Sequence, residues 1–287
     1  MLSDIITKEL TTDQIILLAL AEDLGDGDHT TLATVPENAR GKARLIIKDE
    51  GILCGMNVAT RIYELTDPGM KMTALMKDGA MVKKGDIAFQ IEGSTRTILS
   101  TERLVLNFMQ RMSGIATATH RLVKQLGDLS ARIIDTRKTT PMLRGLEKYA
   151  VRTGGGENHR MGLYDMIMIK DNHVDYAGGI VQAIEAVHDY FRITCKNLKI
   201  EIEVRNFAEL ELVMEHGGVH RIMLDNFAPE NLSKAVVRIS GRFETEASGG
   251  INEQNVRSYA ETGVDFISVG ALTHQIKSLD MSLKAYT

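Results

Sequence analysis

Several features that mark whole classes of protein are scarce in this chain of 287 residues. It has two cysteines, Cys54 and Cys195, whereas a disulfide framework or a zinc site needs more of them at closer spacing. The first residues lack a basic stretch followed by an apolar run, so we expect no signal peptide. The apolar stretch at 15–21 is too short to span a bilayer. These absences predict a cytoplasmic protein with no membrane partner.

Positive charge is not in excess. Lys and Arg number 34 against 38 Asp and Glu, which gives a formal net charge of −4. Duplex nucleic acid is bound through a broad basic surface, so we expect no nucleic-acid partner. The hydrophobic share of 44% and the charged share of 25% are typical of globular proteins and exclude disordered, collagen-like and coiled-coil classes.

Common catalytic signatures are also missing. The chain has no HExxH, CxxC, GxSxG or Walker A motif, and no GxGxxG opens a strand–helix unit. Its 15 methionines fall mostly at core-like positions, and we interpret them as packing residues.

The N-terminal part predicts a mixed domain. Residues 1–22 read as a helical lead-in that Thr11 or Thr12 could cap, and the Gly- and Asp-rich stretch 23–31 predicts irregular structure. Residues 40–95 look rich in strands, with the alternation of short strands at 41–55 and again at 70–93. Residues 98–126 predict a long helix or a helix pair broken near Ser113-Gly114, a plausible domain boundary.

After residue 130, strand and helix patterns alternate, which predicts a parallel sheet. The candidate strands are 131–135, 165–169, 199–204, 221–224, 243–247 and 265–269. Polar or glycine residues follow every one of them, whereas a doubly wound sheet would gather its ligand groups at one switch point. The pattern therefore favours an α/β barrel. Six strands are too few for a closed barrel, so it is incomplete or a strand is hidden at 151–156 or before 131.

The last two strands end in Ser248-Gly249-Gly250 and in Gly270. In α/β barrels these two loops commonly bind phosphate through backbone N–H groups, and glycine allows an anion to approach closely. We therefore predict a phosphate site there.

Basic residues gather on the early strands and their loops. Arginine pairs bidentately with carboxylates and lysine acts as a point charge for phosphate, so the cluster predicts a polyanionic substrate rather than a solvated face. Its members are Arg137, Lys138, Arg144, Arg152, His159, Arg160 and Lys170.

The C-terminal ends of all barrel strands converge on one mouth. Two acidic residues, Glu203 and Asp225, stand at strand ends in this mouth. They could be ion-pair partners, could hold a divalent metal that bridges phosphates, or could stabilise a developing cationic sugar. Glu201 and Arg205 share the strand face of Glu203, and the sequence leaves open which acid reaches furthest into the mouth.

Taken together, the sequence features described above resemble those of the quinolinate phosphoribosyltransferase family, also called nicotinate-nucleotide pyrophosphorylase (carboxylating). The resemblance spans nearly the whole chain in order. The matching stretches are EDLGDGDHTT (22–31), TERLVLNFMQRMSGIAT (101–117), DTRKTTPMLRGLEKYAVRTGGGENHRMGLYDMIMIKDNH (135–173), LDNF (224–227), SGGI (248–251) and ETGVDFISVGALTH (261–274).

This resemblance implies a fold and an assembly. The expected fold is an incomplete, TIM-like α/β barrel of about seven strands over 114–272, with an N-terminal α+β domain over 1–113 that the C-terminal tail 273–287 joins. Members form at least dimers, so a homodimer with active sites shared between subunits is expected.

The resemblance also implies a reaction, in which phosphoribosyl pyrophosphate and quinolinate give nicotinate mononucleotide, pyrophosphate and carbon dioxide with Mg²⁺, in NAD biosynthesis. The implied quinolinate ligands are Arg137, His159, Arg160 and Lys170, with Arg103 from the neighbouring subunit. The implied phosphoribosyl pyrophosphate ligands are Lys138, Glu203, Asp225, Ser248, Gly249, Gly250 and Gly270. The implied catalytic residues are Lys138, Lys170, Glu203 and Asp225, and the two acids would also lie near the Mg²⁺ of the pyrophosphate.

Two departures from the family pattern stand out. Met142 occupies a turn where a small residue is expected, and Arg205 replaces an acid, where it could contact an anion or pair with Glu203. Three other functions stay open: a phosphoribosyltransferase for another base, a Schiff-base aldolase using Lys170, and a non-catalytic metabolite sensor.

Overall fold

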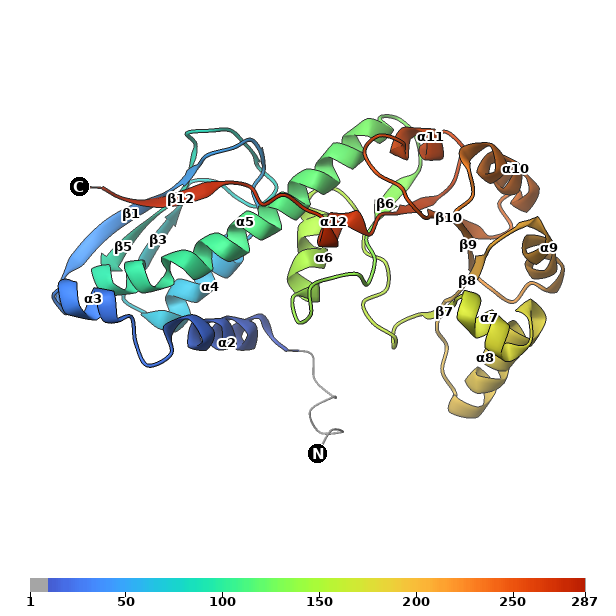
Figure 1. Ribbon diagram of the computed structural model, residues 1–287, viewed down its shortest axis with the longest axis horizontal. Coiled ribbons are helices and arrows are strands. Elements are labelled where there is room, and N and C mark those ends of the chain that lie inside the picture. The colour runs from blue at the N-terminus through green and yellow to red at the C-terminus, as the bar shows by residue number, and fades with distance from the viewer. Residues whose placement is uncertain (1–9, 287) are drawn as a thin grey trace. The chain divides into compact units, whose positions relative to one another are not determined.

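The computed structural model of the protein describes residues 10–286, and its backbone divides into two compact units (Figure 1). The first contains the chain up to Ala118, residues 139–155 and the segment from Gln275 onward. The second contains residues 119–138 and 156–274. The division at 113/114 with a returning tail stays a prediction, and residues 139–155 are the part of the predicted barrel domain that falls in the first unit.

The helices at the N-terminal end begin at side-chain caps. Thr11 caps the first helix through a capping box with Gln14, as the sequence predicts for Thr11 or Thr12. Asp28 accepts the N–H of Thr31 at 3.0 Å and starts a short helix, so the prediction of irregular structure through residue 31 is wrong at its end. The helices of this part are α2 (Thr12–Leu24), α3 (His29–Thr34), α4 (Met56–Thr66), α5 (Thr95–Leu126) and α6 (Arg144–Thr153).

An antiparallel sheet forms the rest of the first unit, in the order β12-β1-β5-β3. It confirms the strand pattern at 40–95, and its last strand comes from the C-terminal end of the chain, where Leu283 pairs with Leu45 of β1. Figure 1 shows this red strand beside the blue β1. The strands are β1 (Arg40–Ile47), β3 (Lys71–Ala74), β5 (Ile87–Ser94) and β12 (Met281–Tyr286), with β2 (Gly51–Ile52) and β4 (Met81–Val82) as a separate pair.

Helix α5 is continuous, so the expected break near Ser113-Gly114 is wrong. The glycine has another reason to be there. A Cβ at Gly114 would lie 2.5 Å from the carbonyl oxygen of Lys277 and 3.0 Å from the Cα of Ser278. Gly114 thus lets the C-terminal segment pass close against the helix, and Leu279 then donates its N–H to the Gln110 carbonyl at 3.0 Å.

The second unit is built on a six-stranded parallel sheet in the order β6-β11-β10-β9-β8-β7, and all six predicted strands occur in it. These strands are β6 (Arg132–Ile134), β7 (Ile167–Ile169), β8 (Ile200–Val204), β9 (Arg221–Asp225), β10 (Glu244–Ser248) and β11 (Phe266–Ser268). The helices between and after them are α7 (Asp171–Ala177), α8 (Ile180–Thr194), α9 (Phe207–His216), α10 (Pro229–Ile239), α11 (Val256–Ala260) and α12 (Ala271–His274).

The barrel is incomplete, as predicted. Residues 151–153 belong to α6, so the strand that we considered at 151–156 is wrong. The additional pairing comes at Glu157, which forms a parallel bridge with Ile134. Glu157 donates its N–H to Ile133 at 2.8 Å and accepts the N–H of Asp135 at 3.2 Å. These bonds bring the segment after Glu157 to the C-terminal end of β6. Within residues 10–286, no helix combines the length and apolar character needed to cross a membrane.

We predict that Gly114→Ala destabilises the protein by about 1–3 kcal/mol, because the new methyl group meets backbone atoms that cannot easily move aside. The measurement is the midpoint of thermal unfolding, which should fall by several degrees. Gly145→Ala on α6 is the control, since a Cβ there meets nothing within 4 Å, and it should leave the midpoint unchanged or raise it. Equal midpoints for Gly114→Ala and the wild type would contradict the close approach.

Candidate active site

The predicted site residues lie at the C-terminal ends of the parallel strands, apart from one. Arg103 is an exposed residue of α5 in the first unit. The others belong to the second unit and lie on or directly after the strands, in the loop that follows Glu157, or in the two glycine loops. They are Arg137, Lys138, His159, Arg160, Lys170, Glu203, Asp225, Ser248, Gly249, Gly250 and Gly270.

Lys170 and the two predicted acids form one group. Lys170 follows β7, and its Nζ lies 3.3 Å from Oε2 of Glu203 on the neighbouring strand β8. Burial raises the pKa of Glu203, and the negative charge of Asp225 on β9 acts in the same direction, whereas Lys170 opposes them. Glu203 is therefore a mostly buried acid that has Lys170 as a cationic neighbour and Asp225 as an anionic one.

Asn226 shapes the first glycine loop. Its backbone is left-handed, with φ of +54°, and its N–H donates to the Ser248 carbonyl at 2.8 Å. A Cβ at Gly249 would lie 2.2 Å from the side-chain oxygen of Asn226, and φ of Gly249 is +102°. Only glycine meets both demands there. The side chain of Asn226 also donates to Oδ2 of Asp225 at 2.5 Å, so one residue ties the acid to the loop.

Lys138 lies against the second glycine loop. A Cβ at Gly270 would be 3.1 Å from the Cδ of Lys138, so the bare glycine leaves room for the lysine stem. Thr273 donates its hydroxyl to the Lys138 carbonyl at 2.8 Å, and the Lys138 N–H donates to Oγ1 of Thr136 at 3.0 Å. The backbone of Lys138 is therefore held while its side chain is exposed beside the predicted phosphate loop.

Arg137 and Arg160 are neighbours of like charge. Burial lowers the pKa of Arg160 below its usual range, and the charge of Arg137 lowers it further. Arg160 donates from Nη1 to the Met166 carbonyl at 3.1 Å. Two adjacent guanidinium groups repel each other until an anion lies between them, and a pair of carboxylates suits their fork geometry.

His159 is placed differently from its neighbours. Its ring is buried inside the barrel, and Nε2 lies 2.9 Å from Oε2 of Glu201 and 3.3 Å from Oε2 of Glu246. Its Nδ1 accepts the backbone N–H of Arg160 at 2.7 Å. Both ring nitrogens are thus engaged within the protein, and a direct contact of His159 with substrate stays a prediction.

His159, Glu201 and Glu246 form a buried layer inside the barrel, and their contacts determine how the layer is protonated. Burial disfavours the charged ring, whereas the hydrogen bonds to Glu201 and Glu246 favour it. The N–H of Arg160 works against this, because a protonated Nδ1 has no lone pair to accept it. The direction of that backbone N–H is set by the chain, so the geometry holds the neutral ring with its proton on Nε2. Burial and then the charge of Glu246 raise the pKa of Glu201 to about 7.

By composition the same three side chains could hold a metal ion, since their ligand atoms lie within 4.8 Å of one another. The hydrogen bond at Nδ1 argues against it. A histidine that binds a metal through Nε2 normally donates a proton from Nδ1, whereas His159 accepts there. Glu246 is also paired with Arg221 at 3.1 Å. We interpret the three side chains as a hydrogen-bonded network that is joined to Arg221 by an ion pair.

Sequence reasoning missed Arg221 and Glu246, although the strand patterns carry a signal for them. Glu201, Arg221 and Glu244 are register partners on β8, β9 and β10, and Arg221 also bonds Glu244 at 3.0 Å. Charged residues that recur inside apolar strands, as in EIEV and ETEA, indicate side chains that point into a barrel.

Asp135 is a second missed residue. It is fully buried, accepts the His159 N–H at 2.9 Å on Oδ1, and accepts from Nδ2 of Asn158 at 2.5 Å on Oδ2. The carboxylate thus holds the loop that carries His159 and Arg160 against the end of β6.

Two expectations need correction, on Arg205 and on the basic cluster. Arg205 does not pair with Glu203 but with Glu209 at 2.7 Å and Asp175 at 3.1 Å. Arg144 and Arg152 lie on α6 in the first unit, so the basic cluster is divided between the units. Met142 has a left-handed φ of +68°, a conformation that costs a residue other than glycine about 1 kcal/mol or more.

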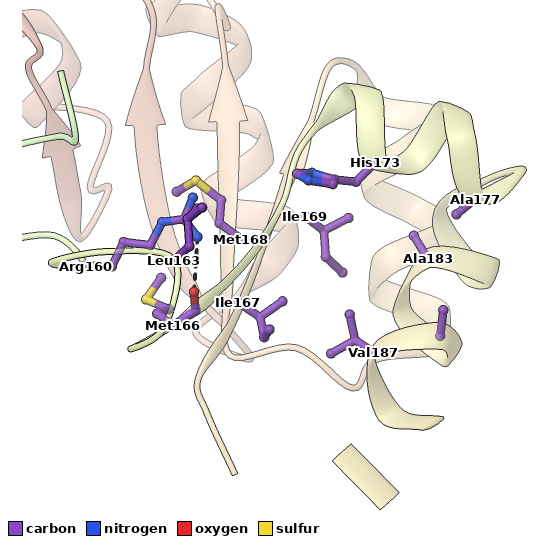
Figure 2. Close-up of a pocket in the computed structure, with 11 residues that line it drawn as sticks. Arg160, Leu163, Met166, Ile167, Met168, Ile169, His173, Ala177, Ala183 and Val187 are labelled. Carbon is purple, nitrogen blue, oxygen red and sulfur yellow. Dashed lines mark hydrogen bonds between the residues drawn. The ribbon is translucent and has the colours of Figure 1, made fainter. Parts of the chain in front are cut away.

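A pocket of about 350 Å³ lies beside the edge strand β7 (Figure 2). Figure 2 shows Arg160 bonded to the Met166 carbonyl at one end, while Ile167 and Ile169 point towards the α8 side chains Ala183 and Val187. The lining is mostly apolar, and Lys170, Glu203 and Asp225 are not part of it. The pocket therefore contains one predicted site residue, Arg160, and none of the three charged residues grouped around Glu203.

The fold and the site together define a class of protein. An incomplete α/β barrel carries cations, carboxylates and two glycine loops at one end of its strands, which is the arrangement of an enzyme that acts on phosphorylated anions.

Comparison with known proteins then places the chain. Residues 28–113 match the N-terminal domain and residues 115–284 the C-terminal domain of quinolinate phosphoribosyl transferase. The chain is 46% identical to the chloroplastic nicotinate-nucleotide pyrophosphorylase [carboxylating] of Arabidopsis thaliana, over 95% of this chain and 82% of that protein. It is 41% identical to a probable nicotinate-nucleotide pyrophosphorylase [carboxylating] of Bacillus subtilis, over 91% of this chain and 89% of that protein.

A solved structure agrees. The nicotinate-nucleotide pyrophosphorylase from Francisella tularensis superposes with a TM-score of 0.90 at 39% identity, covering 96% of each chain. The chain belongs to the quinolinate phosphoribosyltransferase family, whose members are pentosyltransferases of NAD biosynthesis.

We predict that Gly249→Ala distorts the glycine loop, because the new methyl group meets Asn226 and φ is +102°. Equilibrium binding of phosphoribosyl pyrophosphate, measured by calorimetry, should weaken by about tenfold or more, as misplaced contacts do. Gly250→Ala is the matched comparison, since its Cβ meets nothing within 4 Å and only φ of +62° opposes it, so its loss should be smaller. Equal affinity of Gly249→Ala and wild type would remove the loop from the site.

Proposed function

We propose that this chain transfers the phosphoribosyl group of phosphoribosyl pyrophosphate to quinolinate with loss of carbon dioxide, giving nicotinate mononucleotide and pyrophosphate. The observation that carries the proposal is the pairing of opposite charges at one strand edge. Lys170 pairs with Glu203 at 3.3 Å next to Asp225, and Arg137 lies beside Arg160, which suits a dicarboxylate beside a sugar that becomes cationic.

The adjacent guanidinium groups of Arg137 and Arg160 bind the two neighbouring carboxylates of quinolinate, with Lys170 as a third cation. Their mutual repulsion is relieved when the dianion binds. This places the pyridine nitrogen towards the acids on β8 and β9, and positioning of two reactants can supply much of a rate enhancement.

The sugar reacts beside Glu203 and Asp225. As the bond from the ribosyl C1 to pyrophosphate breaks, positive charge develops on the sugar, and the carboxylates stabilise it. The pyridine nitrogen forms the new bond to C1. The ring nitrogen is then positively charged. When the adjacent carboxylate departs as carbon dioxide, its electron pair stays on the ring carbon as a carbanion, which the neighbouring positive charge stabilises. A proton finally replaces that carboxylate on the ring.

The 5′-phosphate binds at Ser248, Gly249, Gly250 and Gly270, with Lys138 beside Gly270 contributing positive charge. Mg²⁺ is the proposed cofactor. Glu203 and Asp225 fit it, because both offer carboxylate oxygens at neighbouring strand ends, the donors that Mg²⁺ prefers. When bound, the ion would neutralise charge on the leaving pyrophosphate.

The proposed assembly is a homodimer in which Arg103 completes the site of the neighbouring subunit. Arg103 supports this because it is exposed on α5, in the unit that does not contain the other site residues. A cytoplasmic location is also proposed, since Cys54 and Cys195 are free thiols, as is usual in reducing compartments.

The aldolase alternative is disfavoured. A Schiff-base lysine is usually desolvated in an apolar pocket, whereas the Lys170 side chain is 47% exposed and pairs with Glu203. Borohydride trapping of Lys170 with a carbonyl substrate would revive that alternative. A sensor that has lost activity would be expected to lack some of the charged groups that this mouth contains.

The direct test is release of carbon dioxide from carboxyl-labelled quinolinate by the purified chain. We expect release only when phosphoribosyl pyrophosphate and Mg²⁺ are both present, with pyrophosphate formed in equal amount. Turnover of nicotinate while quinolinate stays inert would instead assign the chain to another base.

The site assignment predicts that Lys138→Ala and Arg137→Ala each lower turnover by about 100-fold or more, since each removes a charge that positions an anionic substrate. Thermal unfolding should be little changed, because the Lys138 side chain is exposed and Arg137 already lies beside a like charge. Full activity of either variant would contradict the assignment.

The shared site is tested by mixing subunits. Arg103→Ala and Lys138→Ala should each be inactive alone. Unfolding the two together and refolding them should restore about a quarter of wild-type activity, because random pairing gives half heterodimers, each with one intact site. No recovery beyond the sum of the separate variants would exclude a site completed by Arg103 of a partner.

A further inference from the structure

The guanidinium groups of Arg137 and Arg160, which we propose to bind the dicarboxylate, are called the clamp below. We propose that the buried carboxylates Glu201 and Glu246 are positioning residues for this clamp and act through His159 on Arg160. Neither acid reaches the mouth, since both are fully buried in the barrel. The inference rests on the proposed function in one respect, that Arg160 binds the dicarboxylate substrate.

The connection runs through one imidazole ring. On one side its Nε2 lies 2.9 Å from Glu201 and 3.3 Å from Glu246. On the other side its Nδ1 accepts the backbone N–H of Arg160 at 2.7 Å. The carboxylates orient the ring and its proton, and the oriented ring presents a lone pair to the residue that carries the clamp.

The same carboxylates balance the clamp electrically. Arg137 and Arg160 repel each other, and Glu201 lies close enough to Arg160 to oppose that effect on its pKa. Without this opposing charge, the loop that carries Arg160 would tend to move away from Arg137 in the empty enzyme. Arg221 pairs with Glu246 at 3.1 Å from below, so the buried negative charge is itself held in place.

Other anchors of the loop are independent of this layer. Asp135 holds the His159 N–H and the Asn158 side chain, and the Met166 carbonyl holds the Arg160 guanidinium. Loss of the layer should therefore loosen the clamp without unfolding the loop, which makes the effect measurable in a folded enzyme.

The test compares Glu246→Gln and Glu201→Gln with Glu244→Gln in the full-length protein. Glu244 is the matched control, because it lies on the same strand and bonds Arg221 at 3.0 Å, while His159 is not among its partners. We expect KM for quinolinate to rise about tenfold or more in the first two variants, as loosened positioning contacts do. KM for phosphoribosyl pyrophosphate should change less than about twofold, and Glu244→Gln should change neither, because separate sites act independently.

A double-variant cycle tests the route through the ring. His159→Asn retains a side-chain oxygen that can accept the Arg160 N–H but loses the reach to the carboxylates. Glu246→Gln should then raise KM for quinolinate no further in the His159→Asn background. Additive effects in the double variant would overturn the route through His159.

Several outcomes would overturn the inference: an unchanged KM for quinolinate in both buried variants, or an equal rise in KM for both substrates. If one buried variant fails to fold, the other decides. If the wild type does not turn over quinolinate, the proposed function fails, and calorimetric binding of phthalate, a dicarboxylate of like charge, then decides the inference. Weaker phthalate binding by Glu246→Gln than by Glu244→Gln supports it, whereas equal binding, or none by the wild type, overturns it.

Discussion

Two carboxylates are buried inside the incomplete barrel, and their need for charged or hydrogen-bonding partners constrains the residues around them. Glu201 and Glu246 cannot be ionised in that environment without partners, because desolvation of an unpaired charge costs several kcal/mol. Arg221 and His159 supply those partners from below and from the side. The network contacts the loop that carries Arg160 through the ring of His159, which accepts the Arg160 backbone N–H at 2.7 Å.

The mouth above this layer works by placing like charges together. Arg137 beside Arg160, and Glu203 beside Asp225, are each unfavourable in isolation. In the proposed function, the dicarboxylate would relieve the repulsion between the arginines, and a metal ion or a developing cation would relieve that between the acids. The charged side chains are therefore held in place before the substrate binds, because the backbone hydrogen bonds of the parallel sheet keep the strand ends from moving apart.

Glycine and asparagine residues determine the backbone conformation of the loops and the close contacts around them. Gly249 and Gly270 leave space for Asn226 and Lys138, and Gly114 leaves space for the returning C-terminal segment in the first unit. In each case the missing Cβ serves a close approach of other atoms. For Gly114 this explains why a residue typical of a helix break stands within a continuous helix.

The sequence alone determined the alternation of strands and helices after residue 130 and the positions at strand ends where charged and glycine residues would meet. Periodicity carries that information, because the C-terminal ends of parallel strands share one edge. The sequence left open whether the barrel was incomplete or contained a further strand. It could not place the ring of His159, which tertiary contacts turn into the interior, nor the pairing partner of Arg205. It passed over Asp135, Arg221 and Glu246, whose roles depend on residues about 20 or more positions away. Only the tertiary structure decides which of several nearby charges become neighbours, because Coulomb and hydrogen-bond energies depend on distances that sequence spacing does not contain.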